Sequence, residues 1–279
     1  MKKRIVSDSG VNIRTLDRQT DFVTVPLKIN TDEKEFVDDI NLDVQEMVSY
    51  MKNYKGRSGT ACPSVTDWLE AFGDAEEIIC FTITSELSGS YNAACIAKDD
   101  YEAEHPERHV FIVDTLSAGP EMLLLIEKAA ELITQQAEFE VICDTLVKYK
   151  QQTGLMFSLE SLKNLANNGR VSPMVAKFAD VLGIHVVGRA SEKGDLEPTD
   201  KCRGMKKALK KILERMREVG YEGGKVRIDH CNNAESAEML KQQILDKYAT
   251  ADVVIGQTYG LCSFYAECGG LMIGFEKSK

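Results

Sequence analysis

The sequence lacks an excess of positive charge, and it lacks any apolar run long enough to cross a bilayer. Lys and Arg total 34 against 44 Asp and Glu in 279 residues, which gives a net charge of -10. No block of about five basic residues offsets this charge, so nucleic acid and anionic membranes are poor partners. The longest apolar runs, such as Met122–Ile126 and Val253–Ile255, are far shorter than the ~20 residues of a transmembrane helix.

A secretory signal and a metal-binding cysteine pattern are also missing. The N-terminus MKKRIVSDSG has no apolar signal-peptide core, so we expect a cytoplasmic protein. The eight cysteines form no CxxC pair, and the apolar neighbours of Cys80 and Cys143 indicate reduced, mostly buried thiols. Cys262 and Cys268 have no matching His or Cys pair, so we expect no structural metal there.

Motifs for nucleotide binding and for hydrolysis are absent as well. The chain contains no GxxxxGK[ST], no GxGxxG after the first strand and no GxSxG elbow. Its four histidines lie away from the serine-rich loops in sequence, and only His230, at the end of KVRIDHC, could face a pocket. Without an ordered nucleophile, base and orienting residue, we expect no catalytic site.

The order of sequence patterns predicts an α/β fold, because short β-rich runs alternate with longer amphipathic stretches. The expected strands are RIVSD, FVTVPLKI, IICFTIT, HVFIVDT, LMFSL, IHVVGRA, KVRIDHC, ADVVIGQT and GGLMIGF. Helices are expected near residues 42–54, 65–72, 90–101, 140–152, 201–219 and 235–248, with another opening near 118 and helical pieces within 162–182 broken at NNGRVSP.

Chain length favours two domains over one. Residues 1–154 read as parallel strands with crossover helices, and residues 155–279 read as a mixed sheet. We therefore predict a parallel-sheet α/β N-terminal domain and a mixed-sheet α+β C-terminal domain. The boundary is approximate, and either domain can be discontinuous.

Four loops rich in hydroxyl groups and glycine are candidates for an anion site. They are Ser7–Gly10, Gly59–Ser64, Thr84–Ser90 and Asp114–Gly119. Open α/β sheets bind ligands beyond the carboxyl ends of their strands, where backbone N–H groups and the helix dipole favour negative charge. Each hydroxyl alone is more simply a helix cap, and Ser64 with Asp67 predicts a capping box. The four loops together favour a shared anion site.

Six segments resemble the DegV family in order and across nearly the whole chain. They are SDSGVNI, TACPSVTDWLEAF, TITSELSGSYNAA, VDTLSAG, NNGRVS and GGLMIGF. The resemblance implies a two-domain fold that encloses one long-chain fatty acid and needs no cofactor. Several family members serve as the fatty-acid-binding subunit of a bacterial fatty acid kinase, which converts the bound carboxylate into an acyl phosphate. A chain of roughly sixteen carbons would gain on the order of 10 kcal/mol from burial.

The resemblance also implies the residues of the ligand site. Thr60 of TACPS and Ser88 of LSGS match carboxylate-binding hydroxyls, with Ser90 and Ser117 as neighbours. Arg170 in NNGRVS matches an arginine near the head group, although a surface charge beside a helix cap is an alternative. The full implied set is Thr60, Ser88, Gly89, Ser117, Arg170 and Tyr265.

Tyr265 marks a departure from the family pattern. Many relatives carry a histidine in an HTGPG-like loop before the last strand, whereas this chain reads CSFYAECGG, and aligning back from GGLMIGF brings Tyr265 close to that position. A tyrosine can donate a hydrogen bond, but it is not cationic at neutral pH. The head group would then depend on Arg170 and on helix dipoles.

The sequence leaves the partner open. Arg203, in the basic run KCRGMKK, matches a family arginine at the start of the expected helix 201–219, and either a kinase-docking surface or a solvated helix face fits it. Two other functions stay possible: a lipid transport or sensing protein without a kinase partner, and an enzyme acting on a small anion through Ser88 or Ser117.

Overall fold

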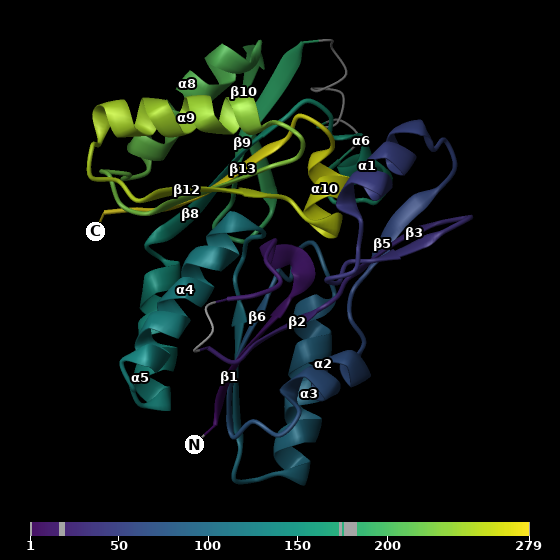
Figure 1. Ribbon diagram of the computed structural model, residues 1–279, viewed down its shortest axis with the longest axis vertical. Helices are drawn as coiled ribbons and strands as arrows, with labels where there is room; N and C mark the ends of the chain where they lie inside the picture. The colour runs from purple at the N-terminus through teal and green to yellow at the C-terminus, as the bar shows by residue number, and fades with distance from the viewer. Residues whose placement is uncertain (1, 17–19, 173–174, 176–182, 279) are drawn as a thin grey trace.

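The computed structural model describes residues 2–16, 20–172, 175 and 183–278, and it contains three β-sheets. A parallel four-stranded sheet has the order β2-β1-β6-β7, and a mixed six-stranded sheet has the order β10-β9-β8-β13-β11-β12 (Figure 1). A small antiparallel sheet has the order β4-β3-β5. The expected α/β fold with a parallel-sheet N-terminal domain and a mixed-sheet C-terminal domain is confirmed.

The strands and helices have the following residue ranges, given in chain order. The strands are β1 Lys3–Asp8, β2 Phe22–Val25, β3 Lys28–Thr31, β4 Glu35–Val37, β5 Ser58–Ala61, β6 Glu77–Thr82, β7 His109–Asp114, β8 Thr153–Leu159, β9 Ile184–Ala190, β10 Leu196–Arg203, β11 Val226–His230, β12 Val253–Gln257 and β13 Leu271–Glu276. The helices are η1 Ser9–Val11, α1 Val44–Asn53, α2 Val65–Phe72, α3 Ser90–Glu104, α4 Pro120–Thr134, α5 Phe139–Lys150, α6 Lys163–Asn167, α8 Met205–Glu218, α9 Ala234–Lys247 and α10 Gly260–Ala266.

The four-stranded sheet lies between two helical layers. One of its two inner strands, β6, is buried at all six positions, as expected for a parallel strand covered on both faces. Trp68 and Phe72 of α2 pack with Ala94 of α3 on one face, while Leu125 of α4 and Leu146 of α5 pack on the other. Burial of apolar side chains on both faces therefore stabilises this sheet.

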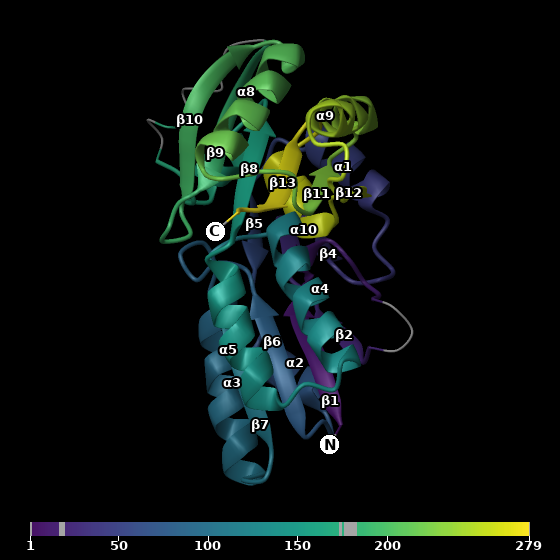
Figure 2. The same ribbon diagram turned by 90° about the vertical axis from the view of Figure 1, so that its left-hand side faces the viewer.

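Helix α4 lies between the two large sheets, whereas α8 and α9 cover the opposite face of the six-stranded sheet (Figure 2). The approach of α4 to β13 is close because Gly274 has no side chain. A Cβ at that position would lie 2.5 Å from the carbonyl carbon of Pro120, nearer than real Cβ contacts allow. The backbone of the α4 N-terminus thus packs directly on β13.

Buried hydrogen bonds join the N-terminal domain to the segment around α10. Asn12 Nδ2 donates to Asp229 Oδ2 at 2.8 Å, and the amide of Tyr259 donates to Asn12 Oδ1 at 3.0 Å. Asp38 accepts hydrogen bonds from the amides of Gly260 and Leu261 at 2.8 and 2.9 Å. These buried polar groups fix α10 and β11 against the loops that follow β1 and β4.

Two expectations about the first half of the chain are wrong in detail. The segment FVTVPLKI is not one strand, because β2 and β3 enter different sheets on either side of Pro26. Proline removes a ladder donor and interrupts a strand. The loop expected over Gly59–Ser64 begins within β5, whose sequence SGTA carries no apolar strand signal.

Two expectations about the second half also need correction. The helix expected over 201–219 begins only at Met205, so Arg203 is the last residue of edge strand β10 and does not start a helix. Strand β10 was missed because Pro198 adjoins a register shift and charged residues dominate its sequence. Helix α10 lies in a segment for which we expected no helix.

Other expectations stay open. Of the helical pieces expected within 162–182, α6 is present, while residues 173–174 and 176–182 lie outside the described residues. Strand β8 begins at Thr153, close to the expected domain boundary at 154, but that boundary stays a prediction. Across the described ranges, no helix combines the length and apolar character that a membrane span requires.

Candidate functional site

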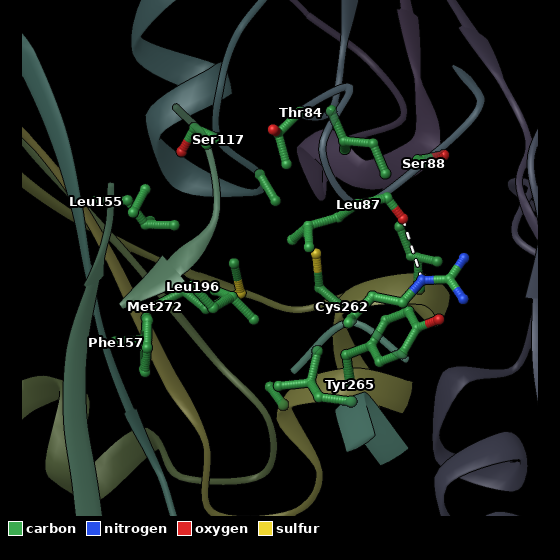
Figure 3. Close-up of a pocket in the computed structure, with 18 of the residues that line it drawn as sticks. Thr84, Leu87, Ser88, Ser117, Leu155, Phe157, Leu196, Cys262, Tyr265 and Met272 are labelled. Atoms are coloured by element: carbon green, nitrogen blue, oxygen red, sulfur yellow. Dashed lines mark hydrogen bonds between the residues drawn. The ribbon is translucent and has the colours of Figure 1, made fainter. Parts of the chain in front are cut away.

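A mainly apolar cavity lies where the two domains meet. It contains about 820 Å³ of space between atoms, including its opening to solvent. Leu27, Ile83 and Leu87 line it from the N-terminal domain. Leu155, Phe157, Leu196 and Met272 line it from the six-stranded sheet and its hairpin (Figure 3). Such a lining suits a flexible hydrocarbon chain.

Among the described residues, six polar side chains line this cavity: Thr60, Thr84, Ser88, Ser117, Arg170 and Tyr265. The cavity thus brings together five of the six residues implied as ligand-binding. The remaining one, Gly89, is the N-cap residue of α3, and a Cβ there would lie 3.2 Å from Cys62 Sγ. Thr84 was not singled out, although it begins one of the expected loops. The role of each residue in binding stays a prediction.

The helix N-termini near the cavity differ in whether another group already accepts hydrogen bonds from their first backbone amides. Asp38 occupies the first amides of α10, and α4 begins with Pro120, which has no amide hydrogen. Helix α3 has no side-chain cap, and the amide of Ser90 donates to Ser88 Oγ at 3.2 Å. Of these helices, only α3 in the described structure offers its N-terminus to an anion, rather than the cluster of N-termini that we expected. Ser88 lies directly beside it.

Thr60 and Tyr265 form a polar pair across the domain interface. Thr60 Oγ1 of β5 and Tyr265 Oη of α10 are 2.7 Å apart, and either hydroxyl can be the donor. Burial raises the pKa of Tyr265, although the hydrogen bond with Thr60 and the charge of Arg170 oppose the shift. Tyr265 is therefore neutral at physiological pH and can donate a hydrogen bond to a ligand anion.

Arg170 is the one cationic side chain among the described residues that line the cavity. Its Nε donates to the carbonyl oxygen of Leu87 at 3.1 Å, the bond drawn as a dashed line in Figure 3, and its Nη1 donates to the carbonyl of Asn168. Within the described chain it has no carboxylate partner, and no Asp or Glu lines the cavity. Its charge is thus available to an anionic ligand.

Ser117 lies apart from the other polar groups. Figure 3 shows Ser88 and the hydroxyl of Tyr265 on one side of the cavity and Ser117 beside Leu155 on the other. Its carbonyl accepts from the amide of Thr84 at 2.8 Å. An anion held at Ser88 would therefore not reach Ser117.

Several hydroxyls of the expected loops serve the fold. Ser64 forms the predicted capping box with Asp67. Ser90 Oγ donates to Asp8 Oδ2 at 2.6 Å. Asp8 is fully buried, and burial raises its pKa to about 6 despite this hydrogen bond. Ser9 Oγ donates to Asp38 at 2.9 Å. These interactions hold the loops in place behind the cavity.

The histidines do not reach the cavity lining. His230 is buried, its Nδ1 accepts from the amide of Asn233 at 3.2 Å, and burial lowers its pKa. No histidine is among the described residues that line the cavity with Ser88, so the geometry offers no nucleophile and base pair there. The described ranges also contain no cluster of three or more His, Cys, Asp or Glu residues that could hold a metal ion.

Comparison with known sequences decides the family. The sequence profile of the DegV family matches residues 2–277. The chain belongs to the DegV family. A DegV domain-containing protein of Streptococcus pneumoniae is 40% identical over 279 residues, which cover 99% of each chain.

Solved DegV structures share the fold closely. A DegV family protein from Eubacterium eligens, loaded with heptadecanoic acid, has a TM-score of 0.97 and 46% identity, covering 99% of this chain and 100% of that one. The Streptococcus pneumoniae Fatty Acid Kinase (Fak) B3 protein, loaded with linoleic acid, has a TM-score of 0.97 and 40% identity, with full coverage of both chains. The DegV resemblance read from the six sequence segments is confirmed.

Proposed function

We propose that this DegV protein binds a long-chain fatty acid, with the hydrocarbon chain in the cavity and the carboxylate beside Arg170. The observation that carries the proposal is the pairing of a mainly apolar cavity with Arg170, the one cation among its described lining residues, which has no described acidic partner. A neutral lipid would leave this charge unpaired, whereas a carboxylate matches it. The fatty acids bound to the Eubacterium eligens and Streptococcus pneumoniae proteins support the same ligand class.

The head group would contact residues from both domains. Ser88, the amides at the α3 N-terminus, Thr60 and Tyr265 offer donors on the side of the cavity where Ser88 and Tyr265 lie. Hydrogen bonds to a charged group contribute about 1.5–3 kcal/mol each, and each buried CH₂ contributes about 0.8 kcal/mol. Polar groups would thus set the orientation of the ligand, and the hydrocarbon chain would make a contribution to the affinity of similar size.

Lipid extraction tests this proposal. Protein purified without delipidation should release close to one equivalent of fatty acid, because lysates contain lipids and the cavity is apolar. Mass spectrometry of a denaturing extract measures the stoichiometry. A matched comparison of oleic acid with oleyl alcohol should show a clear preference for the acid. Extracts without stoichiometric lipid, together with equal affinity for acid and alcohol, would contradict the proposal.

We infer further that a fatty acid kinase phosphorylates the bound carboxylate. The name of the Streptococcus pneumoniae Fak B3 protein supports a kinase partner, and such a partner would have to supply ATP, metal and positioning. Because ATP is available in the cytoplasm, this inference also favours a cytoplasmic protein. The isolated protein should hydrolyse no ATP. A protein that binds fatty acid but supports no acyl phosphate formation with a cognate kinase would instead act in lipid transport or sensing.

A further inference from the structure

The turn between β9 and β10 has one buried residue among exposed ones. Glu192, Lys193 and Asp195 are exposed, whereas Gly194 is buried. The turn is held by its own hydrogen bonds, since Gly194 N donates to Ser191 O at 3.0 Å and Asp195 N donates to Ser191 Oγ at 3.1 Å. The turn is therefore a preformed unit that presents Gly194 to the rest of the protein.

Gly194 packs directly against the N-terminal domain and so allows the turn to contact it. Its φ is +94°, and a Cβ there would overlap Thr84 Oγ1 and lie 3.1 Å from Leu116 Cα. Thr84 follows β6 and Leu116 follows β7, so the contact lies at the carboxyl ends of two parallel strands. Gly194 and Thr84 also line the cavity, as do Ala190 and Leu196 on either side of the turn. The hairpin thus forms one wall of the cavity.

The interactions that hold this wall against the N-terminal domain differ in kind from the other contacts between the domains. Asn12–Asp229, Thr60–Tyr265 and Arg170–Leu87 are joined by hydrogen bonds of 2.8, 2.7 and 3.1 Å. Residues 191–195, by contrast, make no hydrogen bond or ion pair with the described residues of the N-terminal domain. Van der Waals contact weakens over fractions of an ångström, so this wall separates more easily than the hydrogen-bonded contacts.

We infer that the β9–β10 turn is the part of the wall that opens for ligand exchange, and that Gly194 is the positioning residue that lets it close. This inference rests on the proposed fatty acid ligand. In the closed cavity the backbone of Gly194 contacts the loops that carry Thr84 and Leu116, and this contact leaves no space for a methyl group. A side chain at 194 would hold the turn away from Thr84 and Leu116 and would shorten the residence time of the ligand.

Two glycine variants separate closure from backbone strain. Gly183 also has a positive φ, +75°, but no atom of the described residues lies within 4 Å of a Cβ there. Gly194→Ala and Gly183→Ala both impose an unfavourable backbone conformation, and only the first obstructs the contact. Release of radiolabelled oleic acid to excess serum albumin should be about ten-fold faster in Gly194→Ala. In Gly183→Ala it should stay within about two-fold of the wild type.

A second substitution tests the contact itself. Thr84→Ala removes the hydroxyl that overlaps the new Cβ, so Gly194→Ala combined with Thr84→Ala should release oleic acid several-fold more slowly than Gly194→Ala alone. Such non-additivity is the signature of a direct contact, and a general loss of stability does not produce it. Equal release by the two glycine variants, or strictly additive effects of the two substitutions, would overturn the inference.

Hydrogen exchange on the unaltered protein covers the case in which Gly194→Ala does not fold. Amides of residues 191–196 should exchange faster in delipidated protein than in oleate-loaded protein, because an empty cavity leaves the turn less restrained. Equal exchange would remove the turn from the exit route. Oleic acid binding by the wild type is measured first: failure there overturns the proposed function, whereas normal binding with unaltered turn exchange overturns only the role of the turn.

Discussion

Thr60 and Tyr265 are 205 positions apart in the chain, yet their hydroxyl oxygens are 2.7 Å apart at the cavity. One belongs to the small antiparallel sheet and the other to α10. Because the pair spans the domain interface, it couples the head-group donors to the relative position of the two domains. Substitutions in this pair should therefore affect binding together.

Thr60→Val and Tyr265→Phe should each weaken oleic acid binding by about 1.5–3 kcal/mol if each hydroxyl serves the carboxylate. The double variant should lose less than the sum of the two, because the two groups hydrogen-bond to each other. Titration calorimetry of the four proteins measures this cycle. Additive losses would mean that the two hydroxyls act on the ligand independently.

Ser88→Ala should also weaken binding by about 1.5–3 kcal/mol while the protein stays folded. Ser64→Ala is the matched control, since Ser64 caps α2 and does not line the cavity. The control should lower the free energy of unfolding by about 1 kcal/mol and leave the dissociation constant unchanged. Wild-type affinity in Ser88→Ala would show that the head group lies elsewhere.

Arg170→Gln should cause a larger loss of affinity for oleic acid than for oleyl alcohol, because only the acid carries a charge for Arg170 to neutralise. The glutamine amide can still donate to a backbone carbonyl, so part of the contact with Leu87 is retained. Arg170→Lys should recover part of the difference, since it keeps the charge without the planar fork. Parallel losses for acid and alcohol would mean that Arg170 only shapes the cavity.

Asp229 should make stability depend on pH. Burial raises its pKa to about 7 from 3.8, although the hydrogen bond from Asn12 opposes the shift. The native state therefore favours the protonated form. The contribution of Asp229 to the free energy of unfolding is fully present below about pH 4 and is lost as the pH rises to about 7.

Asp229→Asn should reduce the fall in the free energy of unfolding between about pH 4 and pH 7. Chemical denaturation across this range measures it. Asp246→Asn, at an exposed position of α9, is the control and should retain the wild-type dependence. Identical pH profiles for wild type and Asp229→Asn would assign the dependence to other groups, Asp8 foremost among them.

Arg203→Glu should depress acyl phosphate formation with a cognate kinase and leave oleic acid binding intact, because an exposed rim charge acts chiefly on association. Arg203 is exposed at the end of β10, directly before α8. Arg217→Glu, at the far end of α8, is the control and should support normal turnover. Normal turnover by Arg203→Glu at low salt would exclude this surface from the interface.

The sequence by itself determined the α/β order and most element positions. Helix α2 was predicted with its observed bounds because Ser64 and Asp67 form a local capping box and the following residues have a clear apolar face. Strand β6 was also predictable, since a strand buried on both faces reads as a continuous apolar run. In both cases the signal lies within a few neighbouring residues.

Tertiary structure decided the elements without a local signal. Strand β5 carries the sequence SGTA, β10 has charges and Pro198 at a sheet edge, and α10 is only 7 residues long. Each is stabilised by what it packs or pairs with rather than by its own periodicity. The helix expected from residue 201 failed for the same reason, because pairing with β9 extends β10 to Arg203.

Some features of the candidate site were also predictable from the sequence, and others depend on the tertiary structure. Motifs predicted that Ser88, Thr60 and Arg170 belong to it, because those segments resemble the family. Only the folded chain decided that Arg170 lacks a described acidic partner, that Asp38 occupies the α10 N-terminus, and that Ser117 lies away from Ser88. These features depend on distances between segments far apart in the chain, which pairing and packing set and no local pattern encodes.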